Sequence, residues 1–213
     1  MIAVIAGANG LVGNKLVQDL MIDPSFSLVI AVTRKPILLN NNKFKNIICN
    51  DFEKLELLSD QLKGDIYFCC LGSTIKKSKT KENFRKVDYN AVINFAQVAK
   101  MHDALQFIVV SASGADSESS IFYNKTKGEV EQSLINMQLN SLVIFRPGLL
   151  IGSRQENRLA EKISIDLLNF LSPVIPQKIQ KIISTKVDQL CESMIKESKH
   201  SRTPQKIIEA KDI

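Results

Sequence analysis

Short apolar runs alternate along the chain with longer segments in which apolar residues recur at helical spacing. The helical pattern is clearest over residues 80–101 and again from Phe122 to Ile135. Strands that alternate with helices in this way form a parallel sheet covered by helices on both faces. The pattern therefore predicts an α/β fold built on a doubly wound parallel sheet. Its strands are expected near residues 2–6, 27–33, 45–49, 65–70, 105–111 and 141–145.

The pattern changes after residue 150. A polar loop is followed by a helical segment near 157–171, a turn bounded by Pro173 and Pro176, and a second helical segment near 186–198 that Thr185 is placed to cap. No repeat, low-complexity tract or linker divides the chain. We therefore expect one domain over residues 1–213, with a core over about 1–150 and a small C-terminal lobe over about 151–213 on the substrate side.

Three glycines with the spacing Gly-x-x-Gly-x-x-Gly follow the first apolar run directly, and a helical pattern follows them. A strand, a glycine turn and a helix in this order open a dinucleotide-binding βαβ unit of the Rossmann type. The glycines permit the sharp turn, the approach of the backbone to a pyrophosphate and the close packing of the helix, whose free amides face the anion. The phosphate-binding residues predicted here are Gly7, Asn9, Gly10, Leu11, Val12 and Gly13.

The end of the second predicted strand indicates which dinucleotide is bound. An acidic residue at this place binds the adenosine ribose of NAD, whereas an arginine accommodates the 2′-phosphate of NADP. This chain has Arg34 and Lys35 there, so we expect NADP, with NAD less favoured. Asp51, just after the third strand, either meets the adenine amino group or caps a local helix.

The fourth predicted strand ends in Leu71, Gly72, Ser73 and Thr74. In open parallel sheets ligands bind at the carboxyl ends of the strands, and a glycine there lets the chain pass close to the ligand. We expect residues 71–74 to line the cofactor.

Tyr123 precedes Lys127 by four residues in a helical segment, which places both side chains on one face. The charge of the lysine favours tyrosinate, so it is expected to lower the pKa of the phenol, and the ammonium can also hold the nicotinamide ribose. Either Ser111 or Ser113, at the end of the fifth strand, can hydrogen-bond a substrate carbonyl. The predicted catalytic residues are Tyr123, Lys127, Ser111 and Ser113.

Taken together, these motifs resemble the short-chain dehydrogenase/reductase superfamily in its atypical NAD(P)H-binding branch. Residues 68–74, 111–116 and 123–131, with the sequence Phe-Arg-Pro-Gly at 145–148 and Arg-Gln-Glu at 154–156, resemble the Tat-interacting oxidoreductase-like proteins more narrowly. The resemblance implies a Rossmann-type fold, NADPH binding and the Ser/Tyr/Lys set named above. It also implies that Pro147 and Gly148 border the nicotinamide end of the cofactor.

The leading functional prediction is an NADPH-dependent oxidoreductase that reduces a small carbonyl or quinone by hydride transfer, with Tyr123 as the acid. The alternative is a non-catalytic, NADPH-sensing regulatory or partner-binding protein. Helices at 80–101 and 122–136 either pair between the subunits of a homodimer or only cover the sheet.

Composition limits the other classes of protein. The 28 Lys and Arg against 22 Asp and Glu give a net charge of +6, but the basic residues are scattered, so nucleic-acid binding is not expected. His102 and His200 lie far apart, without metal-ligand spacing, and no metal is expected. The four cysteines include no Cys-x-x-Cys pair, which indicates reduced thiols. With no signal peptide or membrane span visible, we expect a cytoplasmic protein that does not bind membranes.

Overall fold

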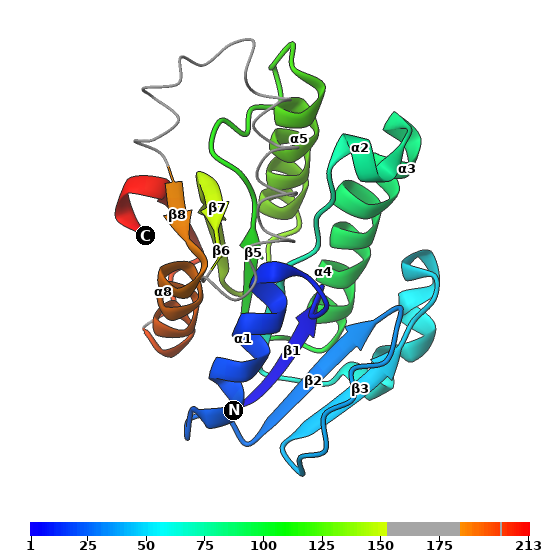
Figure 1. Ribbon diagram of the computed structural model, residues 1–213, viewed down its shortest axis with the longest axis vertical. Coiled ribbons are helices and arrows are strands. Elements are labelled where there is room, and N and C mark those ends of the chain that lie inside the picture. The colour runs from blue at the N-terminus through cyan, green and yellow to red at the C-terminus, as the bar shows by residue number, and fades with distance from the viewer. Residues whose placement is uncertain (153–183, 201) are drawn as a thin grey trace.

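The computed structural model describes residues 1–152, 184–200 and 202–213, and within them the strands form a seven-stranded sheet in the order β3-β2-β1-β4-β5-β6-β9 (Figure 1). Every neighbouring pair of strands in this sheet is parallel, as predicted. The six strands expected from the apolar runs are all present. They are β1 (Ile2–Ala6), β2 (Leu28–Thr33), β3 (Phe44–Ile48), β4 (Ile66–Cys69), β5 (Gln106–Val110) and β6 (Leu142–Arg146).

Helices cover both faces of the sheet because alternate strand residues supply two separate apolar cores. Ala3 and Ile5 of β1 point to the core shared with α1 (Leu11–Ile22) and α8 (Val187–Lys199), which lie side by side (Figure 1). Val4 and Ala6 point to the opposite core, under α4 (Ala91–Met101) and α5 (Phe122–Asn136). Burial on both faces explains why the strand sequences are continuously apolar.

The helix expected over residues 80–101 is present but is not a single regular α-helix. It begins as α3 (Lys81–Arg85), capped by Thr80, continues through a π-helical turn η2 (Lys86–Asn90) and then runs on as α4. A π-helical turn inserts one extra residue and rotates the following side chains relative to the preceding ones, and such turns occur frequently at functional sites.

The C-terminal residues take part in the main sheet. Gln205–Glu209, which the sequence analysis assigned to a small lobe, form β9 and pair with β6. The predicted capping role of Thr185 is wrong. Thr185 lies in β8 (Ser184–Lys186), which pairs with β7 (Leu149–Ile151), and its hydroxyl accepts a hydrogen bond from the backbone N–H of Gly148 at 3.0 Å. The predicted helix at 157–171, Pro173 and Pro176 lie outside the described residues.

Three further short helices complete the part of the chain that the structure describes. They are the kinked 3₁₀ segment η1 (Phe52–Leu62), α2 (Ile75–Ser78) and η3 (Ala210–Asp212). Within residues 1–152, 184–200 and 202–213, no helix has the length and apolar character that crossing a membrane requires.

Candidate functional site

The glycine turn after β1 is packed too tightly for larger residues at two of its three glycines. Gly7 has a φ of +87°, and a Cβ there would lie 2.4 Å from the carbonyl oxygen of Cys70. A Cβ on Gly13 would lie 2.3 Å from the carbonyl oxygen of Gly7. The turn is therefore pressed against the end of β4 on one side and the first turn of α1 on the other.

Gly10 differs from these two glycines because its surroundings are open. It is exposed, its N–H donates to the carbonyl of Gly7 at 2.9 Å, and among the described residues a Cβ there would meet only that carbonyl oxygen, at 3.2 Å. Gly10 is also the N-cap of α1 and provides no capping side chain, and the first turn of α1 contains no acidic residue. The start of α1 therefore offers backbone amides and the positive end of the helix dipole to an anion. Asn9 is exposed beside it, while Leu11 is half-buried and Val12 is buried.

The predicted adenosine-side residues lie next to this turn. Arg34 and Lys35 are exposed directly after β2. The carbonyl of Lys35 accepts hydrogen bonds from the hydroxyl of Thr33 at 2.7 Å and from the side-chain amide of Asn9 at 3.1 Å. The two loops are thus fastened to each other. Asp51 accepts a hydrogen bond from Glu53 N–H at 3.0 Å and so caps η1, which is the second of the two roles considered for it.

Tyr123 and Lys127 lie on the buried face of α5, with the ammonium of Lys127 6.0 Å from the centre of the Tyr123 ring. The ring of Tyr123 also packs against Phe84. The pKa of Tyr123 is raised above its ordinary value, since burial raises it more than Lys127 lowers it, and Asp88 raises it further. The prediction that Lys127 brings the phenol pKa down overall is therefore wrong, because the cost of burying a phenolate outweighs the attraction of the ammonium.

Lys127 is also paired with an acid that was not predicted from the sequence. Its Nζ lies 2.8 Å from Oδ1 of Asp88, which is fully buried in the π-helical turn. The other carboxylate oxygen of Asp88 accepts hydrogen bonds from the backbone N–H of Ser73 at 2.8 Å and from its hydroxyl at 2.7 Å. A Cβ on Gly72 would lie 3.8 Å from Nζ of Lys127. The 71–74 loop and Lys127 therefore lie next to each other.

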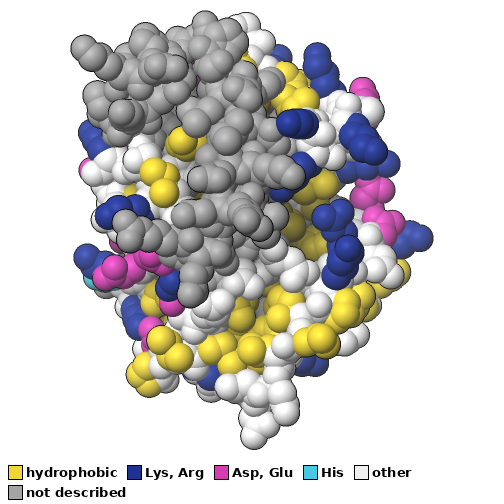
Figure 2. Space-filling view, in the orientation of Figure 1, with side chains coloured by type: hydrophobic (Ala, Val, Ile, Leu, Met, Phe, Trp, Pro, Cys, Tyr) yellow, Lys and Arg dark blue, Asp and Glu magenta, His cyan; other side chains and the backbone are white. Residues whose placement is uncertain are grey.

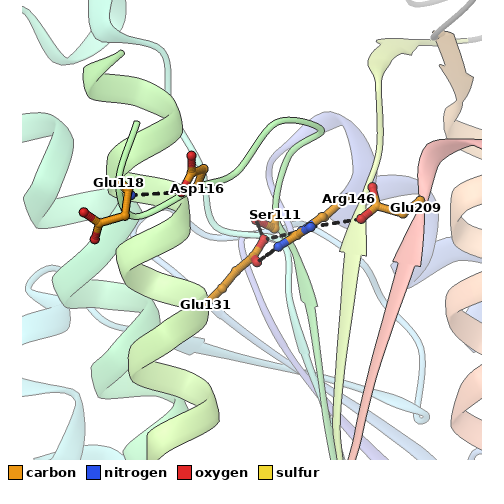
Figure 3. A network of polar contacts seen from close by, with 6 residues as sticks. All are labelled: Ser111, Asp116, Glu118, Glu131, Arg146 and Glu209. Atoms are coloured by element: carbon orange, nitrogen blue, oxygen red, sulfur yellow. Dashed lines mark hydrogen bonds and ion pairs between the residues drawn. The ribbon is translucent and has the colours of Figure 1, made fainter. Parts of the chain in front are cut away.

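The two candidate serines occupy different environments. Ser111 is buried, and its hydroxyl donates a hydrogen bond to the carboxylate of Glu131 (Figure 3). The same carboxylate accepts from Nη2 of Arg146 at 2.6 Å, and Nη1 of Arg146 donates to Glu209 at 2.9 Å. Figure 3 shows Arg146 lying between the two carboxylates, so this network joins β5, α5, β6 and β9. The pKa of Arg146 is raised chiefly by its hydrogen bonds to Glu131.

Ser113 lies beside the Pro147–Gly148 segment. Its backbone N–H donates to the carbonyl of Pro147 at 2.8 Å, and the N–H of Gly148 donates in turn to Thr185. Gly128 allows the loop after Ser111 to pass close to α5, because a Cβ on Gly128 would lie 2.1 Å from the backbone nitrogen of Ser117. The structure therefore gathers Ser113, Pro147 and Gly148 at one edge of the sheet.

Two residues of this region were missed at the level of sequence, and each had a detectable signal. Glu131 continues the four-residue spacing of Tyr123 and Lys127, so all three share one face of α5. Asp88 lies four residues after Phe84 and four before Val92, on the apolar face of the predicted helix, and a carboxylate there is unusual unless it has a partner.

The surface charge is mixed. Figure 2 shows Lys and Arg side chains at several separate places on the visible face, interspersed with apolar and acidic side chains. Within the residues that the structure describes, no three His, Cys, Asp or Glu side chains come together as a metal site would require. The Arg-Gln-Glu sequence at 154–156 lies outside the described residues.

Solved structures with the same fold include MoeE5 in complex with UDP-glucuronic acid and NAD. It has a TM-score of 0.76 and 16% sequence identity, and the match covers 99% of this chain and 76% of that one. The UDP-glucose 4-epimerase of Thermotoga maritima gives a TM-score of 0.73 at 13% identity, with 98% and 76% of the two chains covered. These matches confirm the predicted Rossmann-type α/β fold.

Sequence relatives are closer. HTATIP2 of Rattus norvegicus, a Tat-interacting protein, is 35% identical over 74% of this chain and 66% of its own length. FMP52 of Candida albicans is 35% identical over 72% of this chain and 69% of its own length. The chain thus spans about two thirds of the length of these relatives. The resemblance to the Tat-interacting oxidoreductase-like proteins is confirmed.

The names of these relatives contradict the predicted cytoplasmic location. FMP52 of Candida albicans, and also that of Debaryomyces hansenii, is named a mitochondrial protein. The prediction relied on features that the N-terminal sequence lacks, and absent features do not identify a compartment.

A model of one protein family, described as HIM1, matches residues 36–188, which is well over half of the chain. The match includes the 71–74 loop, Asp88, both serines and the Tyr123/Lys127 pair, and it agrees with the relatives named above. The chain belongs to the HIM1 family.

Proposed function

We propose that the chain is an NADPH-dependent oxidoreductase that reduces a small carbonyl or quinone compound. The observation that carries this proposal is the pair of buried side chains on α5, a neutral phenol at Tyr123 and an ammonium at Lys127. They lie next to the loop after β4, at the edge of a parallel sheet where such folds bind their ligands.

The glycine turn supports the cofactor. Gly10 leaves space at the start of α1, where the helix has no capping side chain and no acidic residue in its first turn. Arg34 and Lys35 support a preference for NADPH, since both are exposed cations on a loop that Asn9 fastens to this turn. When bound, the reduced nicotinamide would supply a hydride.

In the proposed reaction, the Oη–H bond of Tyr123 breaks as its proton passes to the carbonyl oxygen, while the carbonyl carbon receives the hydride and an alcohol forms. A raised pKa suits this role because the phenol stays protonated at neutral pH. The charge of Lys127 stabilises the tyrosinate that remains until solvent protonates it again. Ser113 orients the substrate oxygen, since the hydroxyl of Ser111 is engaged with Glu131.

Replacing Tyr123 with Phe tests this proposal. We expect the variant to bind NADPH normally and to lose about 100-fold or more in turnover across a panel of carbonyls and quinones. Tyr89→Phe is the matched control, because its hydroxyl contacts Ser133 and lies outside the proposed chemistry. Unchanged turnover in Tyr123→Phe would overturn the acid role. If the wild-type protein binds NADPH but turns over nothing in the panel, the non-catalytic NADPH-sensing function is favoured instead.

Two comparisons bear on the panel and on the place of action. UDP-glucose belongs in the panel because solved structures of the same fold contain UDP-sugars and NAD. The names of the FMP52 relatives favour a mitochondrial site of action for this chain. Imaging of a fluorescently tagged full-length protein against a mitochondrial marker tests that location, and exclusion from mitochondria would contradict it.

A further inference from the structure

Asp88 is a fully buried carboxylate that the proposed reaction does not use directly. It lies in the π-helical turn between α3 and α4, and it contacts two segments that are distant in the sequence. Its Oδ1 faces the ammonium of Lys127 on α5 at 2.8 Å. Its Oδ2 accepts both the backbone N–H and the hydroxyl of Ser73, in the loop after β4, at 2.8 and 2.7 Å.

Burying the Asp88–Lys127 ion pair costs free energy unless both charged groups have enough hydrogen-bond partners. An ammonium and a carboxylate taken out of water lose several kcal/mol of hydration each, and only close pairing with further hydrogen bonds offsets that loss. The side chain of Lys127 is 6% exposed and that of Asp88 is 0% exposed. Ser73 supplies the two further hydrogen bonds, so the pair and the loop stabilise each other.

The geometry points to Asp88 as a positioning residue of the nucleotide site, which keeps Lys127 a charged ammonium and fastens the 71–74 loop to it. This inference rests on the proposed function, because Lys127 and that loop are assigned to the cofactor there. Asp88 touches neither the cofactor nor the reacting atoms in this role and acts through Lys127 and Ser73.

The charge of Lys127 depends on the groups that face it. These are Asp88 from the π-helical turn, Tyr123 from α5 and Cys69 from β4. Burial raises the pKa of the Cys69 thiol to about 12, and the pKa of Tyr123 is raised as well, so both are neutral near pH 7. Burial lowers the pKa of Lys127, but the effects of Asp88 and Tyr123 outweigh it and the pKa ends above its ordinary value. Without Asp88, burial would dominate and Lys127 would lose its proton at a lower pH.

The test is Asp88→Asn, with Asp103→Asn as the matched control. Asp103 is exposed before β5, at the opposite edge of the sheet, and its φ of +48° suits asparagine. The Lys127 ammonium is titrated by NMR on protein labelled at the lysine side chains, with Lys127→Arg used for assignment. NADPH affinity is measured by calorimetry at about pH 7 and about pH 9.5, a range over which an unpaired buried lysine loses its charge.

We expect the Lys127 pKa in Asp88→Asn to fall from above its ordinary value to at least about one unit below pH 9.5, because burial then acts without the carboxylate. NADPH affinity should then drop about tenfold or more between the two pH values. Each unit by which the lysine pKa lies below the pH reduces the fraction of charged lysine about tenfold. The wild type and Asp103→Asn should change by no more than about threefold, because their lysine stays charged. A folded Asp88→Asn variant with an unchanged Lys127 pKa, or with unchanged affinity at both pH values, would overturn the inference.

Ser73→Ala is the second test variant and is used if Asp88→Asn does not fold. This change removes one hydrogen bond to Asp88 and keeps the ion pair, so the Lys127 pKa should stay unchanged. NADPH affinity should fall by about three- to tenfold, as expected for the loss of one charge-assisted hydrogen bond. Unchanged affinity would overturn the link between the loop and the pair. The lysine titration needs neither turnover nor nucleotide, so it separates a failure of this inference from a failure of the proposed function.

Discussion

The hydroxyl of Ser111 donates a hydrogen bond to the carboxylate of Glu131, and both side chains are buried. Glu131 is bound on its other side by Arg146. The proton of Ser111 is therefore directed toward α5. The sequence could not separate Ser111 from Ser113, and this contact assigns them different tasks.

We predict that Ser111→Ala lowers stability more than it lowers turnover. The change leaves a buried carboxylate with one donor fewer, which costs about 1.5–3 kcal/mol of unfolding free energy for a hydrogen bond to a charged group. Ser113→Ala should leave stability within about 0.5 kcal/mol and reduce turnover. Chemical denaturation of both variants, together with their steady-state rates, checks this pair. A Ser111→Ala variant that is stable but inactive would show that Ser111, and not Ser113, acts in turnover.

The ion pair between Arg146 and Glu131 gives a second stability prediction. Arg146→Met would leave Glu131 buried without its counter-charge, and breaking a buried pair in this way costs about 3–5 kcal/mol. Arg146→Met combined with Glu131→Met should recover much of that loss, because no charge then remains buried. Thermal unfolding of the single and double variants measures the difference. Equal melting temperatures for the single and double variants would show that Glu131 does not destabilise the fold when Arg146 is removed.

The glycine turn offers a comparison of two identical substitutions. Gly13→Ala should destabilise the fold, since its Cβ would lie 2.3 Å from the carbonyl oxygen of Gly7. Gly10→Ala should fold, because its Cβ would crowd only the carbonyl oxygen of Gly7 among the described atoms, at 3.2 Å, and a shift of a few tenths of an ångström relieves that contact. It should nevertheless bind NADPH at least about tenfold more weakly, through loss of close backbone approach. Calorimetry with NADPH and a melting curve are needed for each variant. Normal NADPH affinity in Gly10→Ala would mean that the ligand does not approach this turn.

The raised pKa of Tyr123 predicts the pH dependence of reduction. The reaction requires the protonated phenol, and burial moves the ionisation of that phenol above its ordinary value of 10.0. The rate attributable to Tyr123 should therefore hold from neutral pH to about pH 10 and decline only beyond it. A pH profile of turnover under saturating NADPH makes the measurement. A decline centred between about pH 7 and 8 would show that Tyr123 is not the acid, or that its pKa is lowered.

Arg34 provides the prediction for cofactor choice. Arg34→Ser should weaken NADPH binding by about 10- to 100-fold, the worth of charge-assisted hydrogen bonds to a phosphate, and should leave NADH binding within about threefold. Arg202→Ser serves as a control, because Arg202 is also exposed but lies before β9. Equal losses for the two nucleotides would place Arg34 away from the 2′-phosphate.

Much of the fold could be predicted because buried parallel strands have a simple signature. Each of the six predicted apolar runs became a strand, and no end of a strand differs from its predicted position by more than one residue. The glycine turn lies where the strand-to-helix pattern required. Tyr123 and Lys127 were paired correctly because the four-residue spacing of a helix fixes which residues share a face. These successes rest on local periodicity.

The failures involve partners that local sequence does not specify. Thr185 was expected to cap a helix, but strand pairing between β7 and β8 turns its hydroxyl to Gly148. The role of Asp88 could not be predicted because its partners, Lys127 and Ser73, come from other segments that the periodicity of one helix does not bring together. The pKa of Tyr123 was predicted in the wrong direction because sequence gives the neighbouring charge but not the extent of burial.

Calorimetric titration of the full-length protein with NADPH and, separately, with NADH shows whether the turn after β1 binds a pyridine dinucleotide. We predict saturable binding of both nucleotides, with NADPH tighter by about tenfold or more because of its 2′-phosphate. Absence of binding by either nucleotide at concentrations of about 1 mM would contradict the claim, since a built phosphate site should reach at least that affinity.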